Sequence, residues 1–405
     1  MSDRFAAFRH LSYRRYFASR FATAFSVQIV SVAVGWQIYD QTQNAALLGW
    51  IGLVQFLPAL LLVVVTGVTA DRVGRRLVMG TAILLEMACA AGILFLAVTS
   101  QFDPVWVLGI LTVFGIARAF LSPASASLAV NIVPTEDFAN AVSWTASSWQ
   151  MASILGPVAG GLLYGVSPVV AYSTAVTTLA VSAGLIFSIP KPSQRKSGEP
   201  TTLATLLGGF SYVWKEKVVF GAISLDLFAV LLGGAVALLP IYARDILELG
   251  PAGLGLLRAA PGIGAMAMLA AVTAFPIRDH AGVILFLSVG LFGLATVIFG
   301  ASTIAWLSIV ALMLVGGLDM ISVLIREVLL QLWTPDEVRG RVNAVNSIFL
   351  GASNELGEAR AGFMAAKLGA VFTVVAGGAA AIGVAMAWAA LFPGLRKARH
   401  LDQRH

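Results

Sequence analysis

Charge is scarce in this chain of 405 residues, of which only 11% are Asp, Glu, Lys or Arg while 59% are hydrophobic. Mean hydropathy is +0.88. Soluble domains carry about 45–50% apolar and about 25% charged residues. The composition therefore excludes an ordinary soluble domain and indicates an integral membrane protein.

Cysteine and histidine are nearly absent. Cys89 is the only cysteine, which excludes a disulfide framework. The four histidines all fall in polar segments or near the ends of the chain, outside the long apolar stretches. We therefore expect no metal site, no cofactor and no histidine proton relay inside a membrane.

Motifs for nucleotide binding and hydrolysis are missing as well. The sequence has no G-x-x-x-x-G-K-[ST] loop to hold phosphates, and no H-E-x-x-H or G-x-S-x-G pattern. We expect neither a protein driven directly by nucleotide nor an enzyme.

Long apolar stretches, in contrast, fill most of the chain. A membrane span needs about 20 mostly apolar residues, and twelve stretches meet this length. They are 17–39, 46–70, 77–98, 105–131, 138–163, 167–189, 218–243, 251–275, 282–300, 303–329, 343–366 and 370–393.

The positive charges support this topology. If the N-terminus lies in the cytoplasm, 20 of the 26 Lys and Arg residues fall in cytoplasmic segments when Arg20, near the cytoplasmic end of the first span, is counted with the N-terminal arm; only Arg244 and Lys367 fall outside. Cytoplasmic loops are enriched in Lys and Arg. We expect a multi-pass protein of the cytoplasmic (inner) membrane with both termini in the cytoplasm, and the net charge of +6 needs no nucleic-acid partner.

A weak internal repeat divides the chain. Matching segments recur at an offset of 203 residues, as a duplicated six-helix unit would leave them: Ile38-Tyr39 with Ile241-Tyr242, Pro58 with Pro261, and Asn140–Val142 with Asn343–Val345. The polar, basic stretch between the two copies is a linker. The expected parts are an N-terminal six-helix bundle (1–189), a cytoplasmic linker (190–217) and a C-terminal six-helix bundle (218–405).

The most informative motif is Gly-Val-Thr-Ala-Asp-Arg-Val-Gly-Arg-Arg at residues 67–76. Four charges within six residues predict a short cytoplasmic loop, and its two glycines permit a tight turn. The pattern resembles the loop signature of the major facilitator superfamily of secondary transporters. That resemblance implies a gating role, in which the loop latches onto the segment 339–343; the alternative is a topology anchor. The gating residues would be Gly67, Asp71, Arg72, Gly74, Arg75 and Arg76.

A second motif, Gly-Pro-Val-Ala-Gly-Gly, spans residues 156–161. Glycines three to four residues apart let helices approach closely, and a proline bends a helix. The motif resembles the G-P-x-x-G-G signature of the exporting, antiporter branches of the superfamily, which implies gating roles for Gly156, Pro157, Gly160 and Gly161. The alternative is an ordinary seam of small residues.

Ionisable residues inside the predicted spans form the third signal, because each costs about 2.5–3.5 kcal/mol to insert and needs a partner, water or a function. By resemblance, Arg118, Asp226 and Asp319 line the central cavity. Arg118 and Asp319 each lie sixteen residues before a proline that ends their helix. We hypothesise that these two residues pair across the cavity; the alternative is a local partner for each. The candidates are Glu86, Arg118, Asp226, Arg258, Asp319, Arg326, Glu355, Glu358 and Arg360.

Glu355 and Glu358 lie three residues apart, hence on one helical face. Such a carboxylate pair could carry a proton, or Arg360 or Arg326 could neutralise one member as a structural bridge. The surrounding Ser-Asn-Glu-Leu-Gly-Glu, at residues 353–358, resembles the superfamily branch that contains the bacterial enterobactin exporter.

These patterns together predict an all-α membrane protein of twelve transmembrane helices in two pseudo-symmetric six-helix bundles, the major facilitator fold. The expected function is proton-coupled export of a small amphipathic organic molecule, such as a siderophore or drug, by alternating access. The expected partners are this substrate, protons and the lipid bilayer, and we expect a monomer. The alternatives are a proton-coupled importer of a small metabolite and a receptor or scaffold that transports nothing.

Overall fold

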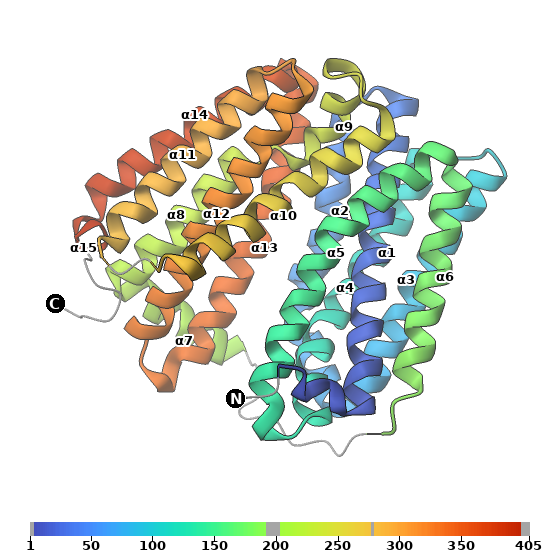
Figure 1. Cartoon of the computed structure of the whole chain (residues 1–405), viewed down its shortest axis with the longest axis horizontal. Coiled ribbons are helices and arrows are strands. Elements are labelled where there is room, and N and C mark those ends of the chain that lie inside the picture. The colour runs from blue at the N-terminus through green and yellow to red at the C-terminus, as the bar shows by residue number, and fades with distance from the viewer. Residues whose placement is uncertain (1–3, 192–202, 277–278, 398–405) are drawn as a thin grey trace. The chain divides into compact units, whose positions relative to one another are not determined.

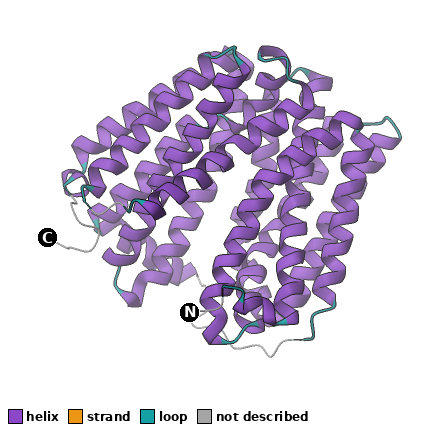
Figure 2. Ribbon diagram, in the orientation of Figure 1, coloured by secondary structure: helices purple, strands orange, loops and turns teal. Residues whose placement is uncertain are grey.

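The computed structural model describes residues 4–191, 203–276 and 279–397, without the side chains of 63–64, 67–68, 70–71, 203–207 and 336–337. These residues form helices and short connections, and no strand occurs among them (Figure 2). The chain divides into two compact units. Unit 1 comprises Met1–Gln41, Val54–Thr201 and Gly250–Gly255; unit 2 comprises Thr42–Leu53, Thr202–Leu249 and Leu256–His405.

The first half of the chain contributes six long helices and two short 3₁₀ turns (Figure 1). They are η1 (Ala6–Arg9), α1 (Leu11–Thr42), α2 (Ala45–Val73), α3 (Arg75–Val98), α4 (Pro104–Ile132), η2 (Thr135–Asp137), α5 (Phe138–Val166) and α6 (Pro168–Phe187).

The second half begins with an amphipathic helix and continues with longer apolar ones. Its elements are α7 (Leu203–Lys215), α8 (Lys217–Gly233), η3 (Val236–Leu238), α9 (Leu239–Ile241), the π-helical turn η4 (Tyr242–Ile246), α10 (Gly250–Ala274), α11 (Ala281–Ala301), α12 (Ala305–Trp333), α13 (Asp336–Leu368), α14 (Ala370–Leu391) and α15 (Pro393–Arg396).

Ten helical segments of the described chain are long and apolar enough to cross a membrane. The sequence predicts twelve spans, and the two not among the ten correspond to α5 and α13. Both are long, at 29 and 33 residues. They are more polar than the others because α5 carries a run of Ser, Thr and Asn and α13 carries charged side chains, which a helix can keep only where they face protein or water.

One predicted loop is wrong. The motif at 67–76 is not a loop: α2 continues to Val73, α3 starts at Arg75, and Gly74 alone separates them. The seventh predicted span, 218–243, corresponds to the candidate span Lys217–Ile246, within which α8 stops at Gly233 and short helical turns follow. Within the predicted linker, 190–217, lies the amphipathic helix α7, whose Val213 is buried against α8, α12 and α13.

Small hydroxyl residues hold α1 against α6 in unit 1. The Ser19 and Ser182 hydroxyls lie 2.7 Å apart, and the Thr23 hydroxyl lies 2.7 Å from Ser182. Ser26 and Thr178 form a further hydroxyl contact. Because no water competes inside an apolar bundle, such contacts let two helices pack closely.

The N-terminal segment docks on the start of α5. The Ala7 amide donates to Asn140 Oδ1 over 3.1 Å, and His10 Nε2 lies 2.9 Å from Asp137 Oδ2. Phe8 packs edge-on to Trp144 at a ring-centroid distance of 5.3 Å. The segment is therefore part of unit 1.

Unit 2 has its own apolar core between α8, α11, α12 and α14. Leu225, Leu285, Ile325 and Val384 are buried in it together. Figure 1 shows α11 and α14 side by side along their length, in agreement with their packing.

The turn at Gly74 generates the first prediction. Its backbone has φ 110° and ψ 120°, a conformation that side-chain-bearing residues rarely adopt. Gly74→Ala should therefore cost about 1–3 kcal/mol of stability and lower the melting temperature of the detergent-purified protein.

Gly184→Ala is the matched control, because Gly184 lies within α6 and a Cβ there meets no atom within 4 Å. Alanine favours a helix over glycine by up to about 1 kcal/mol, so the control should melt at the same or a higher temperature. Equal melting temperatures for the two variants would contradict the strained turn.

Candidate functional site

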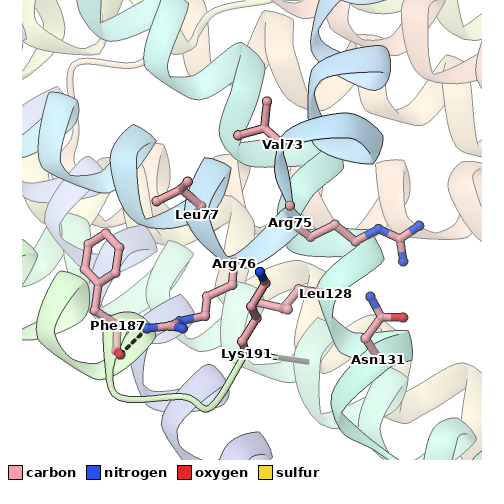
Figure 3. A pocket seen from close by; sticks show the side chains of 9 residues that line it. Val73, Arg75, Arg76, Leu77, Leu128, Asn131, Phe187 and Lys191 are labelled. Atoms are coloured by element: carbon pink, nitrogen blue, oxygen red, sulfur yellow. Dashed lines mark hydrogen bonds between the residues drawn. The ribbon is translucent and has the colours of Figure 1, made fainter. Parts of the chain in front are cut away.

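The first motif borders a basic cavity of about 250 Å³ in unit 1 (Figure 3). Arg75 is buried, and its Nη1 donates to the Ser127 carbonyl over 3.1 Å. Arg76 donates through Nη2 to the Phe187 carbonyl, on the opposite side of the cavity from Asn131 in Figure 3. The two arginines thus tie the start of α3 to the ends of α4 and α6.

The gating role of this motif stays a prediction. Arg72 is exposed, whereas the surroundings of Gly67 and the side chain of Asp71 lie outside what the structure describes. The expected latch partner, 339–343, lies at the start of α13 in unit 2.

The second motif is a point of close helix contact. A Cβ on Gly156 would lie 2.5 Å from the Cβ of Gln28, and one on Gly160 would lie 3.0 Å from the Cα of Ile29, so α5 touches the backbone of α1 here. A Cβ on Gly161 would lie 2.4 Å from the Pro251 carbonyl oxygen, in the 250–255 segment of unit 1. Pro157 lies inside α5. Every glycine of the motif is therefore required by a neighbouring backbone.

A second cavity of unit 1, of about 190 Å³, collects three charged side chains. Arg20 comes from α1, Glu86 from α3 and Arg118 from α4. Arg118 Nη1 donates to Gln55 Oε1 over 3.2 Å. The structure thus gives Arg118 a local partner, while its predicted pairing with Asp319 stays a hypothesis.

The charges of unit 2 meet between α8 and α12. Arg326 and Asp226 form an ion pair in which the side chains are only 1% and 7% exposed. Asp319 lies two helical turns before Arg326 on α12, lines the same small cavity as Asp226, and interacts electrostatically with both members of the pair. One guanidinium, that of Arg326, therefore interacts with two carboxylates. Because Arg326 forms its ion pair with Asp226, the negative charge of Asp319 is not fully compensated.

Glu355 and Glu358 are half-buried on α13. The two arginines that the sequence offers as their partners bind elsewhere: Arg326 pairs with Asp226, and Arg360 Nη2 donates to the Leu232 carbonyl over 2.6 Å. Glu358 instead interacts electrostatically with Arg258 of α10. If an arginine neutralises one carboxylate of this pair, it is Arg258 acting on Glu358, and not Arg326 or Arg360.

Sequence reasoning did not predict that Arg326 pairs with Asp226, or that Arg20 lines the same cavity as Glu86 and Arg118. The spacing of 319 and 326, seven residues on one helix, signals a shared face. The approach of α8 to α12, and of α1 to α3 and α4, carries no local sequence signal, because it depends on packing between distant segments.

Comparison with known proteins assigns the chain to a family. The family model of the Major Facilitator Superfamily matches residues 16–326. The chain belongs to the major facilitator superfamily. It is similar to the enterobactin exporter EntS of Shigella boydii serotype 4, with 27% identity, over 92% of this chain and 88% of that one. The EntS of Escherichia coli O9:H4 is also 27% identical, over 97% of this chain and 94% of that one.

Solved structures agree on the fold. The nucleoside transporter NupG superposes with a TM-score of 0.73 at 14% identity, over 94% of this chain and 99% of that one. A D-xylose–proton symporter superposes with a TM-score of 0.69 at 14% identity, over 93% and 96% of the respective chains. These structures confirm the major facilitator fold, and the family match identifies a multi-pass membrane transporter.

The buried ion pair of this superfamily member generates the second prediction. Removing one partner of a buried pair leaves an uncompensated charge and costs about 3–5 kcal/mol. Arg326→Met should therefore lower the melting temperature strongly, because it leaves the buried Asp226 and Asp319 carboxylates without their shared guanidinium. The triple variant Arg326→Met, Asp226→Leu and Asp319→Leu should recover most of the loss.

Asp245→Asn is the matched control, because Asp245 pairs with Arg244 at 3.0 Å while its side chain is 36% exposed. Exposed pairs contribute about 0–1 kcal/mol, so this variant should melt near the wild type. A triple variant no more stable than Arg326→Met would contradict the assignment.

Proposed function

We propose that this chain exports a small amphipathic organic molecule of the siderophore or drug class across the bacterial inner membrane, in exchange for protons. The observation that carries the proposal is its alignment with proteins named enterobactin exporters over 92% of its length. The Gly-Pro motif supports export through its resemblance to the G-P-x-x-G-G signature of the exporting branches, and its glycines lie at close helix contacts within unit 1.

Asp319 is the carboxylate best suited to carry the proton. Asp226 is held by Arg326, whereas Asp319 shares that guanidinium and retains surplus negative charge. A proton on Asp319 removes a charge that is costly inside the protein. Its arrival and departure would bias the bundles between two states, as alternating access requires.

We assign gating to the two motifs, whose residues lie at helix ends and at close contacts between helices. The Gly74 turn and the Arg75 and Arg76 bonds make the ends of α3, α4 and α6 move together. The close contact of α5 with α1 at Gly156 and Gly160 makes these two helices move as one. Unit 1 would thus act as a rigid body during transport.

Transport by Asp319→Asn tests the coupling. In inside-out vesicles with an acidic lumen, the wild type should accumulate radiolabelled enterobactin. The variant should lose this gradient-driven accumulation but still equilibrate enterobactin down its own gradient, because only the proton-carrying group has been removed.

Asp245→Asn serves as the control, since it removes an exposed carboxylate of the same half, and it should transport like the wild type. If Asp319→Asn keeps both the flux and its pH dependence, the coupling assignment fails. Accumulation only in right-side-out vesicles would favour the importer.

The proposed orientation has a separate test in a Cys89→Ala background. Gln101 is exposed between α3 and α4, and Glu136 is exposed between α4 and α5. A membrane-impermeant maleimide should label Glu136→Cys in inside-out vesicles only and Gln101→Cys in right-side-out vesicles only. The reverse pattern would place the termini outside the cytoplasm.

A further inference from the structure

The cavity between α1, α3 and α4 is lined by a carboxylate that has no hydrogen-bond partner among the described residues. Glu86 is fully buried, and neither of its carboxylate oxygens has a hydrogen-bond partner among the described residues. An ionisable group left without a partner inside a protein is expensive and marks a function. The side chain lines the cavity of about 190 Å³, so a small shift of its carboxylate toward this space would let a group that enters the cavity bind it.

Two guanidiniums share the cavity with Glu86. Arg118 interacts with it electrostatically but bonds to Gln55. Arg20 Nη1 donates to the Ser125 hydroxyl, while its buried Nε has no partner among the described residues. The cavity therefore presents hydrogen-bond acceptors on α3 and donors on α1 and α4.

The charges select the ligand. An anionic group would satisfy the arginines but would lie against the Glu86 carboxylate, and a cationic group would satisfy Glu86 but would face two guanidiniums. A neutral hydroxyl fits both sides, because its hydrogen donates to a carboxylate while its oxygen accepts from a guanidinium. Apolar side chains complete the walls: Ala24, Val27, Met79, Leu121 and Trp149.

Size limits what the cavity can hold. Pockets for drug-sized ligands span about 300–1,000 Å³, so a cavity of about 190 Å³ accepts only one end of such a molecule. We propose that the Glu86 cavity is a subsite for a neutral hydroxyl on an apolar ring of the cargo, and that this hydroxyl and a proton alternate on Glu86. The proposal deepens the proposed export function and rests on it for its physiological cargo.

Alternation follows from the chemistry of the carboxylate. Ionised Glu86 accepts the ligand's hydrogen, whereas a proton on Glu86 occupies that acceptor and weakens its attraction for Arg118. The other groups that face Glu86 are Arg20 of α1, Arg118 of α4 and Cys89 of α3. No residue of α5 or α6 is charged. Ligand affinity should therefore fall as the pH is lowered.

Binding is tested on the full chain in lipid nanodiscs by ¹⁹F NMR titration with 3-fluorobenzyl alcohol, after subtraction of empty nanodiscs. The wild type should bind the alcohol better than 3-fluorobenzyl methyl ether, which lacks the hydroxyl hydrogen, and better than the anion 3-fluorobenzoate. Glu86→Gln should weaken alcohol binding by about tenfold to a hundredfold and abolish its pH dependence, because a charge-assisted hydrogen bond is lost.

Two further variants keep the test decisive. Glu86→Asp retains the carboxylate and should keep pH-dependent binding, and Glu136→Gln, on an exposed turn, should bind like the wild type. If the ether or Glu86→Gln binds as the wild type binds the alcohol, Glu86 does not accept the ligand's hydroxyl hydrogen and the proposal is wrong. Tighter binding of the benzoate would make it an anion site instead. Because transport is not measured, a failure here is distinct from a failure of export.

Discussion

The cost of burying charge in an apolar bundle governs this structure. Each ionisable side chain inside a helix must find a partner, reach water or carry a function, and the structure shows each solution. Asp226 and Arg326 pair, Arg360 donates to a backbone carbonyl, and Glu86 faces a cavity. Function is therefore best sought where the pairing is incomplete, at Asp319 and Glu86.

Close contact between helices is the second determinant. Without a hydrophobic driving force in lipid, helices associate through small residues and hydroxyl contacts. In unit 1, α1 meets α6 through Ser19 and Ser182 and meets α5 at Gly156 and Gly160. Helix α1 is thus fixed on two sides, and this positions Arg20 beside Arg118 and Glu86.

Much of the fold could be predicted from the sequence, because lipid imposes a length and a composition on every span. The helices of the superfamily fold and the approximate boundaries follow from apolar runs. The error arose where a charged segment continues two helices and does not form a loop between them. The sequence predicts a loop for the charged motif at 67–76, but the motif lies in α2 and α3 with Gly74 alone between them.

The sequence by itself determined the class of protein, the superfamily and the residues whose burial demands an explanation, because these depend on composition and on local spacing. Only the tertiary structure decided which charges meet. Asp226 selects Arg326, Glu358 faces Arg258, and Glu86 remains without a hydrogen-bond partner among the described residues. The physical reason is that Coulomb energy and hydrogen bonding depend on distances between segments far apart in the chain, which no local pattern encodes.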